Sequence, residues 1–130
     1  MVSAGRVVAK YIKGSPYKMR KVIDLIRGKD VNSALGILGN VEKRSRIYLD
    51  RALKSAIASA KQGGKLKQDD LFIWKITADD GPIMRRYKAQ AMGRAAMIRK
   101  RTSHIIIELG VIERRPKKVP AKSGTPKSGK

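Results

Sequence analysis

Apolar residues in the first half of the chain recur at the three- and four-residue steps of an amphipathic helix. One such stripe predicts a helix from Ser15-Pro16 to about Arg27, and its members are Met19, Val22, Ile23 and Ile26. Serine before proline favours a helix start, because the hydroxyl can accept a free backbone N–H and proline gives up a donor that has no partner there. Gly28 favours an end at this point.

Two further helices are predicted by the same spacing. A short one runs from Asp30 or Asn32 through Leu38, with Gly39 as its terminator. Its inner face would carry Ala34, Leu35 and Leu38. A longer one runs from about Val41 to Gln62 and is ended by Gly63-Gly64. Its apolar stripe is Leu49, Leu53, Ala56, Ile57 and Ala60, and its other face is basic.

Three strands are predicted from β-branched content and period-two alternation. The first is Arg6–Lys13 and the last is Ile105–Ile112, where Ile105, Ile107, Leu109 and Val111 alternate. Between them, alternation along Leu71–Ala78 would put Phe72, Trp74, Ile76 and Ala78 on one face and Leu71, Ile73, Lys75 and Thr77 on the other. The pattern leaves open whether Trp74 lies in the core or faces a partner.

Residues 81–104, between the last two strands, contain seven basic residues and no acidic one. The natural reading is a hairpin too basic and too poor in bulky apolar residues to pack on its own protein. With about 14 extended residues in each arm the hairpin would reach about 45 Å, against a radius of gyration of about 13 Å for a small domain. We therefore expect residues 79–104 to form an arm that protrudes from the predicted helices and strands, which we call the body.

The composition narrows the choice of partner. The chain has 130 residues, a formal net charge of +21 and no cysteine, so a disulfide scaffold and thiolate metal sites are excluded. A charge this large favours nucleic acid, with an anionic membrane as the second candidate. Residues 114–130 hold seven basic residues, no acid and three prolines, a composition typical of a disordered tail. No apolar run approaches the ~20 residues of a membrane span.

Catalytic and metal-binding roles find little support. His104 is the single histidine, and the sequence gathers no partners around it, so we expect a structural or RNA-facing role. The acidic pairs Asp69-Asp70 and Asp79-Asp80 adjoin turns, and alternation sends neighbouring strand residues to opposite faces. We expect no enzymatic activity, no cofactor and no metal.

Three separated motifs carry a specific resemblance. They are SPYKMRKVIDLIRGKDV (residues 15–31), SAIASA (residues 55–60) and GPIMRRYKAQAMGRAAMIRKRTSHI (residues 81–105). In order and spacing they resemble the family of large-subunit ribosomal protein twenty-two, of bacterial type. The resemblance implies an α+β fold, with a three-stranded antiparallel sheet packed on three helices. One departure is Ala89-Gln90-Ala91, where many members have Pro-Arg-Ala, and another is Ser59, where the family has asparagine.

The resemblance also implies a function and partners. The protein would be a structural constituent of the large ribosomal subunit that binds 23S-type ribosomal RNA, supports subunit assembly, and lines the polypeptide exit tunnel with its hairpin tip. Its partners would be this RNA, neighbouring ribosomal proteins including protein four at the tunnel constriction, and the nascent polypeptide. It would not bind membranes or form a homo-oligomer, and it would lie in the cytoplasm, with an organelle matrix left open. Residues 1–113 would be a single RNA-binding domain.

The expected site residues follow from the charge pattern and the motifs. Those expected to contact RNA are Lys18, Arg20, Lys21, Arg27, Arg85, Arg86, Tyr87, Lys88, Gln90, Arg94, Arg99, Lys100, Arg101 and His104. Those expected at the tunnel-lining tip are Met84, Arg85, Arg86, Lys88, Gln90, Met92, Gly93 and Arg94. Arginine suits such contacts, because its planar fork bridges phosphate oxygens and stacks on bases.

Other function classes remain as alternatives at this point. A DNA architectural protein could use a β-arm in the minor groove, although such arms prefer a proline wedge at the tip and here the tip region has no proline beyond Pro82. A nuclease would need an acid/base or metal constellation. A cationic membrane-surface peptide is disfavoured, because the strongest charge lies in the arm and the tail rather than on a helix face.

Overall fold

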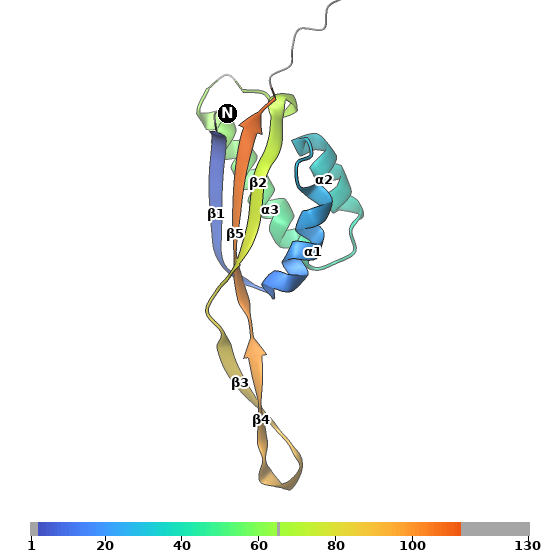
Figure 1. The fold of residues 1–130 in the computed structure, drawn as a ribbon, viewed down its shortest axis with the longest axis vertical. Coiled ribbons are helices and arrows are strands. Elements are labelled where there is room, and N and C mark those ends of the chain that lie inside the picture. The colour runs from blue at the N-terminus through green and yellow to red at the C-terminus, as the bar shows by residue number, and fades with distance from the viewer. Residues whose placement is uncertain (1–2, 65, 113–130) are drawn as a thin grey trace, which may run out of the picture.

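The computed structural model describes residues 3–64 and 66–112, which form a sheet, three helices and a protruding hairpin (Figure 1). In chain order the elements are β1 (Ser3–Lys13), α1 (Pro16–Ile26), α2 (Val31–Asn40), α3 (Ser45–Gln62), β2 (Leu71–Asp80), β3 (Met84–Ala89), β4 (Ala95–Lys100) and β5 (Thr102–Val111). This confirms the predicted α+β class. The predicted basic tail, residues 114–130, lies outside the described residues.

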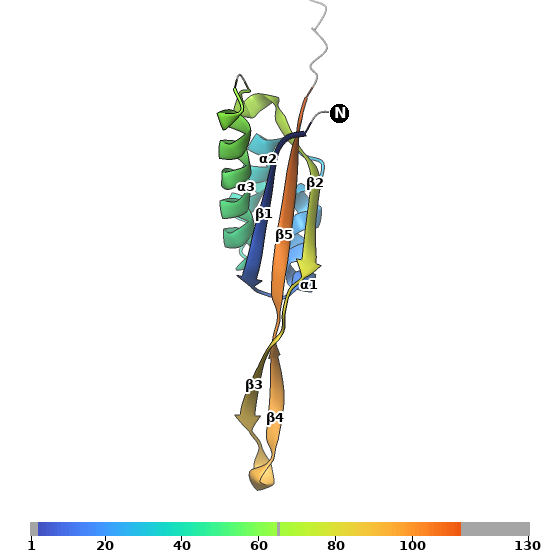
Figure 2. The same ribbon diagram turned by 90° about the vertical axis from the view of Figure 1, so that its left-hand side faces the viewer.

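The main sheet is antiparallel with the strand order β1-β5-β2, so β5 lies between the other two strands. The helices pack on one face, where α1 contacts β2, and α3 contacts β1 and β5 (Figure 2). On β1 this face is lined by Val7 and Ala9, while Val8 between them is exposed on the other face. The strands β3 and β4 form a second sheet that continues beyond one end of the first, and we call it the arm.

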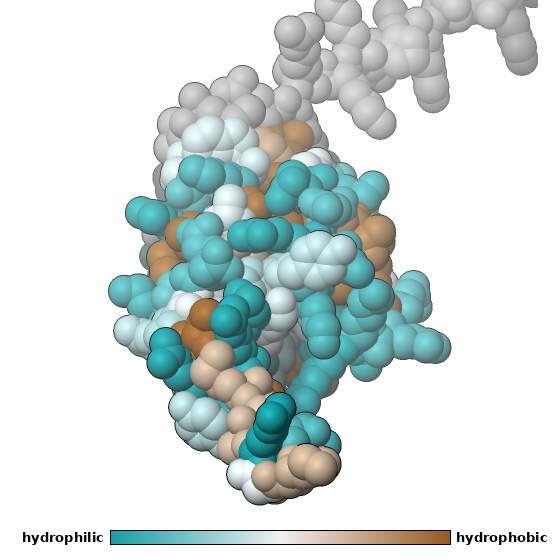
Figure 3. Space-filling view, turned by 60° about the horizontal axis from the view of Figure 1, so that its bottom comes forward, coloured by the Kyte–Doolittle hydropathy of each residue, from teal (hydrophilic) through white to brown (hydrophobic). Residues whose placement is uncertain are grey.

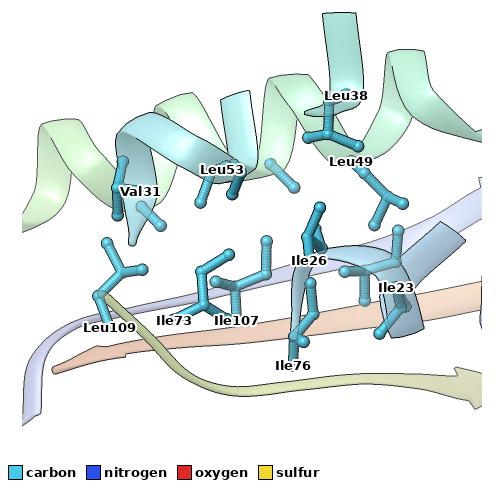
Figure 4. Close-up of a cluster of buried hydrophobic side chains, with 14 of the residues drawn as sticks. Ile23, Ile26, Val31, Leu38, Leu49, Leu53, Ile73, Ile76, Ile107 and Leu109 are labelled. Atoms are coloured by element: carbon cyan, nitrogen blue, oxygen red, sulfur yellow. The ribbon is translucent and has the colours of Figure 1, made fainter. Parts of the chain in front are cut away.

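Side chains from all three helices and from the sheet meet in one core (Figure 4). The predicted stripes of the first and third helices are buried throughout, and on α2 the residues Ala34 and Leu38 are buried while Leu35 is partly so. The sheet contributes Ile73, Ile76, Ile105, Ile107 and Leu109, each at most 1% exposed. Burial of these aliphatic side chains, at about 1.5–3 kcal/mol each, is the main favourable contribution to folding.

Two helix boundaries differ from the sequence prediction. The third helix begins at Ser45 rather than near Val41, because the preceding residues form a tight turn in which Arg46 N–H donates to Lys43 O at 3.1 Å. Gly39 does not end the second helix, which continues to Asn40. Glycine terminates a helix by adopting positive φ, and Gly28 does so with φ of 74° whereas Gly39 does not.

The two predicted capping side chains do not act as caps. Ser15 and Asp30 occupy the N-cap positions of α1 and α2 with extended backbone, as expected, but neither side chain donates or accepts a capping hydrogen bond. Proline at the first position of α1 is confirmed. The backbone at these positions therefore follows the prediction, while the N–H groups of the first turns have no capping side chain.

The predicted faces of β2 are wrong beyond its midpoint. Ile73 pairs with Leu109 and Lys75 pairs with Glu108, so Trp74 is an extra residue in the ladder. Such a bulge shifts the alternation by one residue. Leu71 and Ile73 are buried before it and Ile76 and Ala78 after it, whereas Trp74 is 48% exposed. Trp74 is therefore outside the core.

Leu53 on α3 provides a test of the core. It is fully buried, so Leu53→Ala should lower the free energy of unfolding by about 2–5 kcal/mol through lost transfer energy and a residual cavity. The matched control is Ile47→Ala on the same helix, where the side chain is 45% exposed and the change should stay within about 0.5 kcal/mol. Denaturant unfolding of both variants measures the difference. Equal effects would show that the stripe of α3 does not form the core.

Candidate nucleic-acid interface

The arm has almost no buried surface of its own. All residues of β3 and β4 are exposed except Met84, which is half-buried, and Tyr87 is 69% and Met92 98% exposed. A two-stranded hairpin is marginally stable in water unless something packs on it. The predicted protrusion is confirmed, because the arm extends away from the body in both ribbon views (Figures 1 and 2).

Cations occupy both faces of the arm. The register places Arg85 opposite Arg99 and Tyr87 opposite Met97 on one face. On the other face Met84 lies opposite Lys100 and Arg86 lies opposite Ile98. Like charges directly opposite each other destabilise a strand pair, and residues 81–107 contain no acid to offset them. An anionic partner that surrounds the arm would remove this repulsion.

The apex of the arm is a short 3-10 turn at Ala91–Gly93. Met92 and Gly93 both have positive φ, of 62° and 72°, and Gln90 N–H donates to Arg94 O at 2.7 Å. Gly93 tolerates this conformation because it has no Cβ. The arrangement holds Gln90, Met92 and Arg94 together at the tip.

Other residues of the predicted tip lie farther back. Met84 is the first residue of β3, paired with the last residue of β4, and it lines a pocket against the body. Arg85 and Arg86 follow it in the basal half of the arm. The structure therefore divides the predicted tunnel set into an apex from Gln90 to Arg94 and a basal group.

Two arginines of the predicted RNA set have partners inside the protein. Arg20 on α1 donates through Nε and Nη2 to Ala78 O, at 3.2 and 3.0 Å. Arg27 donates to Ile76 O at 3.4 Å and forms an ion pair with Asp24 at 3.1 Å. Both carbonyls belong to β2, an edge strand of the sheet. The two arginine side chains therefore donate hydrogen bonds to carbonyl oxygens at the edge of the sheet, in addition to any contact that they make with RNA.

The remaining predicted residues of the body differ in their surroundings. Lys21 Nζ lies 4.6 Å from the centre of the Tyr17 ring, in a cation–π contact on the surface of α1. His104 Nδ1 accepts the backbone N–H of Tyr11 at 3.1 Å, and the two rings meet edge to face at 5.1 Å. Tyr11 has a φ of 59°, so this hydrogen bond supports an unusual backbone conformation. His104 thus has the structural role that we expected as one of two alternatives.

Lys18 lies in a group that the sequence did not reveal. It lines a pocket of about 610 Å³ between the body and the base of the arm, together with Arg99, Lys100 and Arg101. Lys13 and Arg44 line the same pocket, and neither was in the predicted set. Their position in the sequence could have indicated them, because Lys13 lies three residues before the first residue of α1 and Arg44 lies one residue before the first residue of α3.

The described residues contain no candidate metal site and no candidate membrane span. Among residues 3–64 and 66–112 no group of three or more His, Asp or Glu side chains is placed to hold a metal ion. No helix in the described part of the chain is long and apolar enough to cross a membrane. Asp79 and Asp80 are exposed at the end of β2, where they pair with His104 and Ser103.

The main sheet and the helices contain the hydrophobic core, and the arm is exposed and cationic. Together they define a class of protein that binds a polyanion through an extended basic hairpin. Comparison with known proteins gives the family. The model described as Ribosomal protein L22p/L17e matches residues 7–110, so the chain belongs to this family of ribosomal proteins. The membership confirms the predicted resemblance and the expectation of a protein that is not an enzyme, and it separates the chain from the DNA-architectural and nuclease alternatives.

Curated relatives agree with the family match. The protein of Halothermothrix orenii is 51% identical over 102 residues, which cover 78% of this chain and 90% of the relative. The protein of a Sulfurihydrogenibium species is 48% identical over 109 residues, covering 84% and 93%. That of Rubrobacter xylanophilus is 46% identical over 108 residues, covering 83% and 85%. Each of the three is named large ribosomal subunit protein uL22.

The junction between body and arm depends on Gly81. Its N–H donates to Thr102 O at 2.9 Å, and the Thr102 hydroxyl donates to Pro82 O at 2.6 Å. A Cβ at residue 81 would lie 3.1 Å from the Thr102 carbonyl and closer still to its side chain. Gly81→Ala should therefore lower the free energy of unfolding by about 1–3 kcal/mol through overpacking.

Gly36 supplies the matched control for this junction. It lies inside α2, and a Cβ there would meet no atom within 4 Å. Gly36→Ala should raise the free energy of unfolding by about 0.4–1 kcal/mol, because alanine restricts the unfolded chain. Denaturant melts of both variants give the comparison. If Gly81→Ala were as stable as Gly36→Ala, the close approach at the arm base would be wrong.

Proposed function

We propose that the protein is a structural constituent of the large ribosomal subunit that binds 23S-type ribosomal RNA and supports subunit assembly. The observation that carries the proposal is the exposed arm, with cations on both faces and no acid. A dense array of phosphates neutralises such an arm from several sides at once. The names of the relatives place them in the large subunit, in agreement with this role.

The arm and the body have different tasks in this proposal. Residues 1–113 act as one RNA-binding domain, in which the body docks on RNA and the arm enters between RNA segments. Binding orders the arm in its final environment, since the isolated hairpin buries too little to be rigid by itself. Residues 114–130 add a basic tail. The protein works within ribosomes of the cytoplasm or of an organelle matrix, without forming a homo-oligomer.

The apex of the arm is proposed to line the polypeptide exit tunnel. The support is the arm motif shared with the family and the position of Gln90, Met92 and Arg94 at the most distant point of the fold. Met92, at 98% exposure, offers an apolar contact to a passing nascent polypeptide. Ribosomal protein four would face this apex across the constriction. Arg85 and Arg86, in the basal half, serve as phosphate contacts in this arrangement.

The phosphate contacts of the arm are tested by Arg85→Ala/Arg86→Ala. Each lost phosphate contact should make the plot of log affinity against log salt concentration less steep by about 0.7–0.9. The slope of the double variant should therefore be smaller in magnitude by about 1.4–1.8. The control with the same charge loss is Lys10→Ala/Lys75→Ala, two exposed cations of the main sheet, and its slope should not change. The measurement is binding to transcribed 23S ribosomal RNA over a salt series, together with the RNA footprint. An unchanged slope and footprint for Arg85→Ala/Arg86→Ala would refute the role of the arm.

A further inference from the structure

The junction pocket at the base of the arm gathers positive charge from three parts of the chain. Its cations are Lys13 at the end of β1, Lys18 in the first turn of α1, Arg44 before α3, Arg99 and Lys100 at the end of β4, and Arg101 just after it. Figure 3 brings this end of the molecule forward, and hydrophilic residues cover much of the body surface around the arm. Six cations thus converge where the two sheets meet.

These charges lack counter-ions among the residues that the structure describes. No acidic residue of the described chain lines the pocket. The ion pairs in residues 3–64 and 66–112 join Arg6 to Glu108, Arg27 to Asp24 and Lys54 to Asp50, and none involves a cation of the pocket. Cations gathered without acids repel one another and attract anions. The described part of the chain therefore supplies no negative charge to balance the cations of the pocket.

The backbone adds to the positive character of the pocket. Two helices begin at its wall, α1 beside Gly14 and Ser15, and α3 at Ser45. Neither has a side-chain cap at its N-terminus or an acid in its first turn. A helix N-terminus carries partial positive charge and free N–H groups, which favour anions. At α3 the N–H groups of Arg46 and Ile47 already donate to Lys43 O and Arg44 O, so this helix contributes its partial charge rather than free donors.

The size of the pocket distinguishes a chain of phosphates from a single ion. Its volume of about 610 Å³ lies in the range of about 300–1,000 Å³ that is usual for ligand pockets. Its partly exposed apolar lining, from Tyr48 and Met84, suits the less polar sugar portion of a nucleic-acid strand. A single inorganic phosphate would leave most of the cations and this apolar surface without contacts.

We infer that the junction pocket binds the sugar-phosphate backbone of one ribosomal RNA strand, with Lys13 and Arg44 as phosphate contacts beside Lys18 and Arg99–Arg101. The inference rests on the proposed function. The pocket walls belong to both the body and the arm, which are connected through residues 81–83 and Arg101. One bound strand therefore bridges the two parts and fixes the direction of the arm relative to the body.

The first test removes the two residues that are new to the site. Lys13→Ala/Arg44→Ala should make the salt dependence of binding to transcribed 23S ribosomal RNA less steep by about 1.4–1.8. The affinity advantage of the unmodified protein should then shrink about tenfold between about 50 and about 200 mM salt. Both side chains are exposed, so the unfolding midpoint should not change. The control Lys10→Ala/Lys75→Ala has the same charge loss outside the pocket.

The second test locates the RNA by photo-crosslinking. A benzoylphenylalanine in place of Tyr48 lies in the pocket wall, one in place of Tyr87 lies on the arm, and one in place of Trp74 lies exposed on β2. The inference expects crosslinks to 23S RNA from positions 48 and 87 and none from 74. An unchanged salt slope, or a crosslink at 87 without one at 48, overturns the pocket and leaves the arm in place. Loss of the crosslinks at both 48 and 87 would overturn the proposed function itself.

Discussion

The pairing of β5 on both of its edges is the interaction on which the rest of the structure depends. This strand pairs with β1 on one side and β2 on the other, and its buried side chains Ile105, Ile107 and Leu109 form the floor on which the helices pack. Its N-terminal end follows directly from β4. The position and direction of the arm are therefore set by the central strand of the main sheet, because the same segment of chain leads from β4 into β5.

The body and the arm differ in their charge as clearly as they differ in their packing. The core forms in the body, where acids such as Asp24, Asp50 and Glu108 pair with nearby cations. The arm has cations opposite one another and lacks the apolar area to offset their repulsion. Its stability must come from what it binds. A protein built this way can hold its binding elements exposed before assembly without the arm collapsing onto the body.

The edge of β2 shows how cations can have a structural use in such a basic protein. A free strand edge invites pairing with another chain. Here Arg20 and Arg27 donate to the carbonyls of Ala78 and Ile76, and Ile73 N–H donates to Lys29 O. The segment from α1 to α2 thus covers the edge along much of its length. The charge pattern and the family motif predict both arginines as RNA contacts, and their internal partners are visible only in the fold.

Elements that depend on local periodicity and composition could be predicted from the amino-acid sequence. The apolar stripes of the helices, the alternation along β5, the protruding arm and its lack of acids could all be read from neighbouring residues, because helix and strand periods act over short distances. The same holds for the glycines after α1 and α3, since Gly28 and Gly64 both adopt the positive φ that glycine permits. Family membership followed from motifs in these same segments.

Features that depend on strand register, or on residues that are distant in sequence and meet in space, became visible in the folded structure. The bulge at Trp74 is fixed by which residues of β5 face β2, and nothing within Leu71–Ala78 specifies that pairing. The pocket of Lys13, Arg44 and Arg99–Arg101 joins residues far apart in sequence, and their shared surface exists only once the strand order β1-β5-β2 is set. Long-range strand pairing selects one geometry from many that the local pattern permits. The sequence therefore showed where the basic residues lie along the chain, but not which residues lie beside them in the fold.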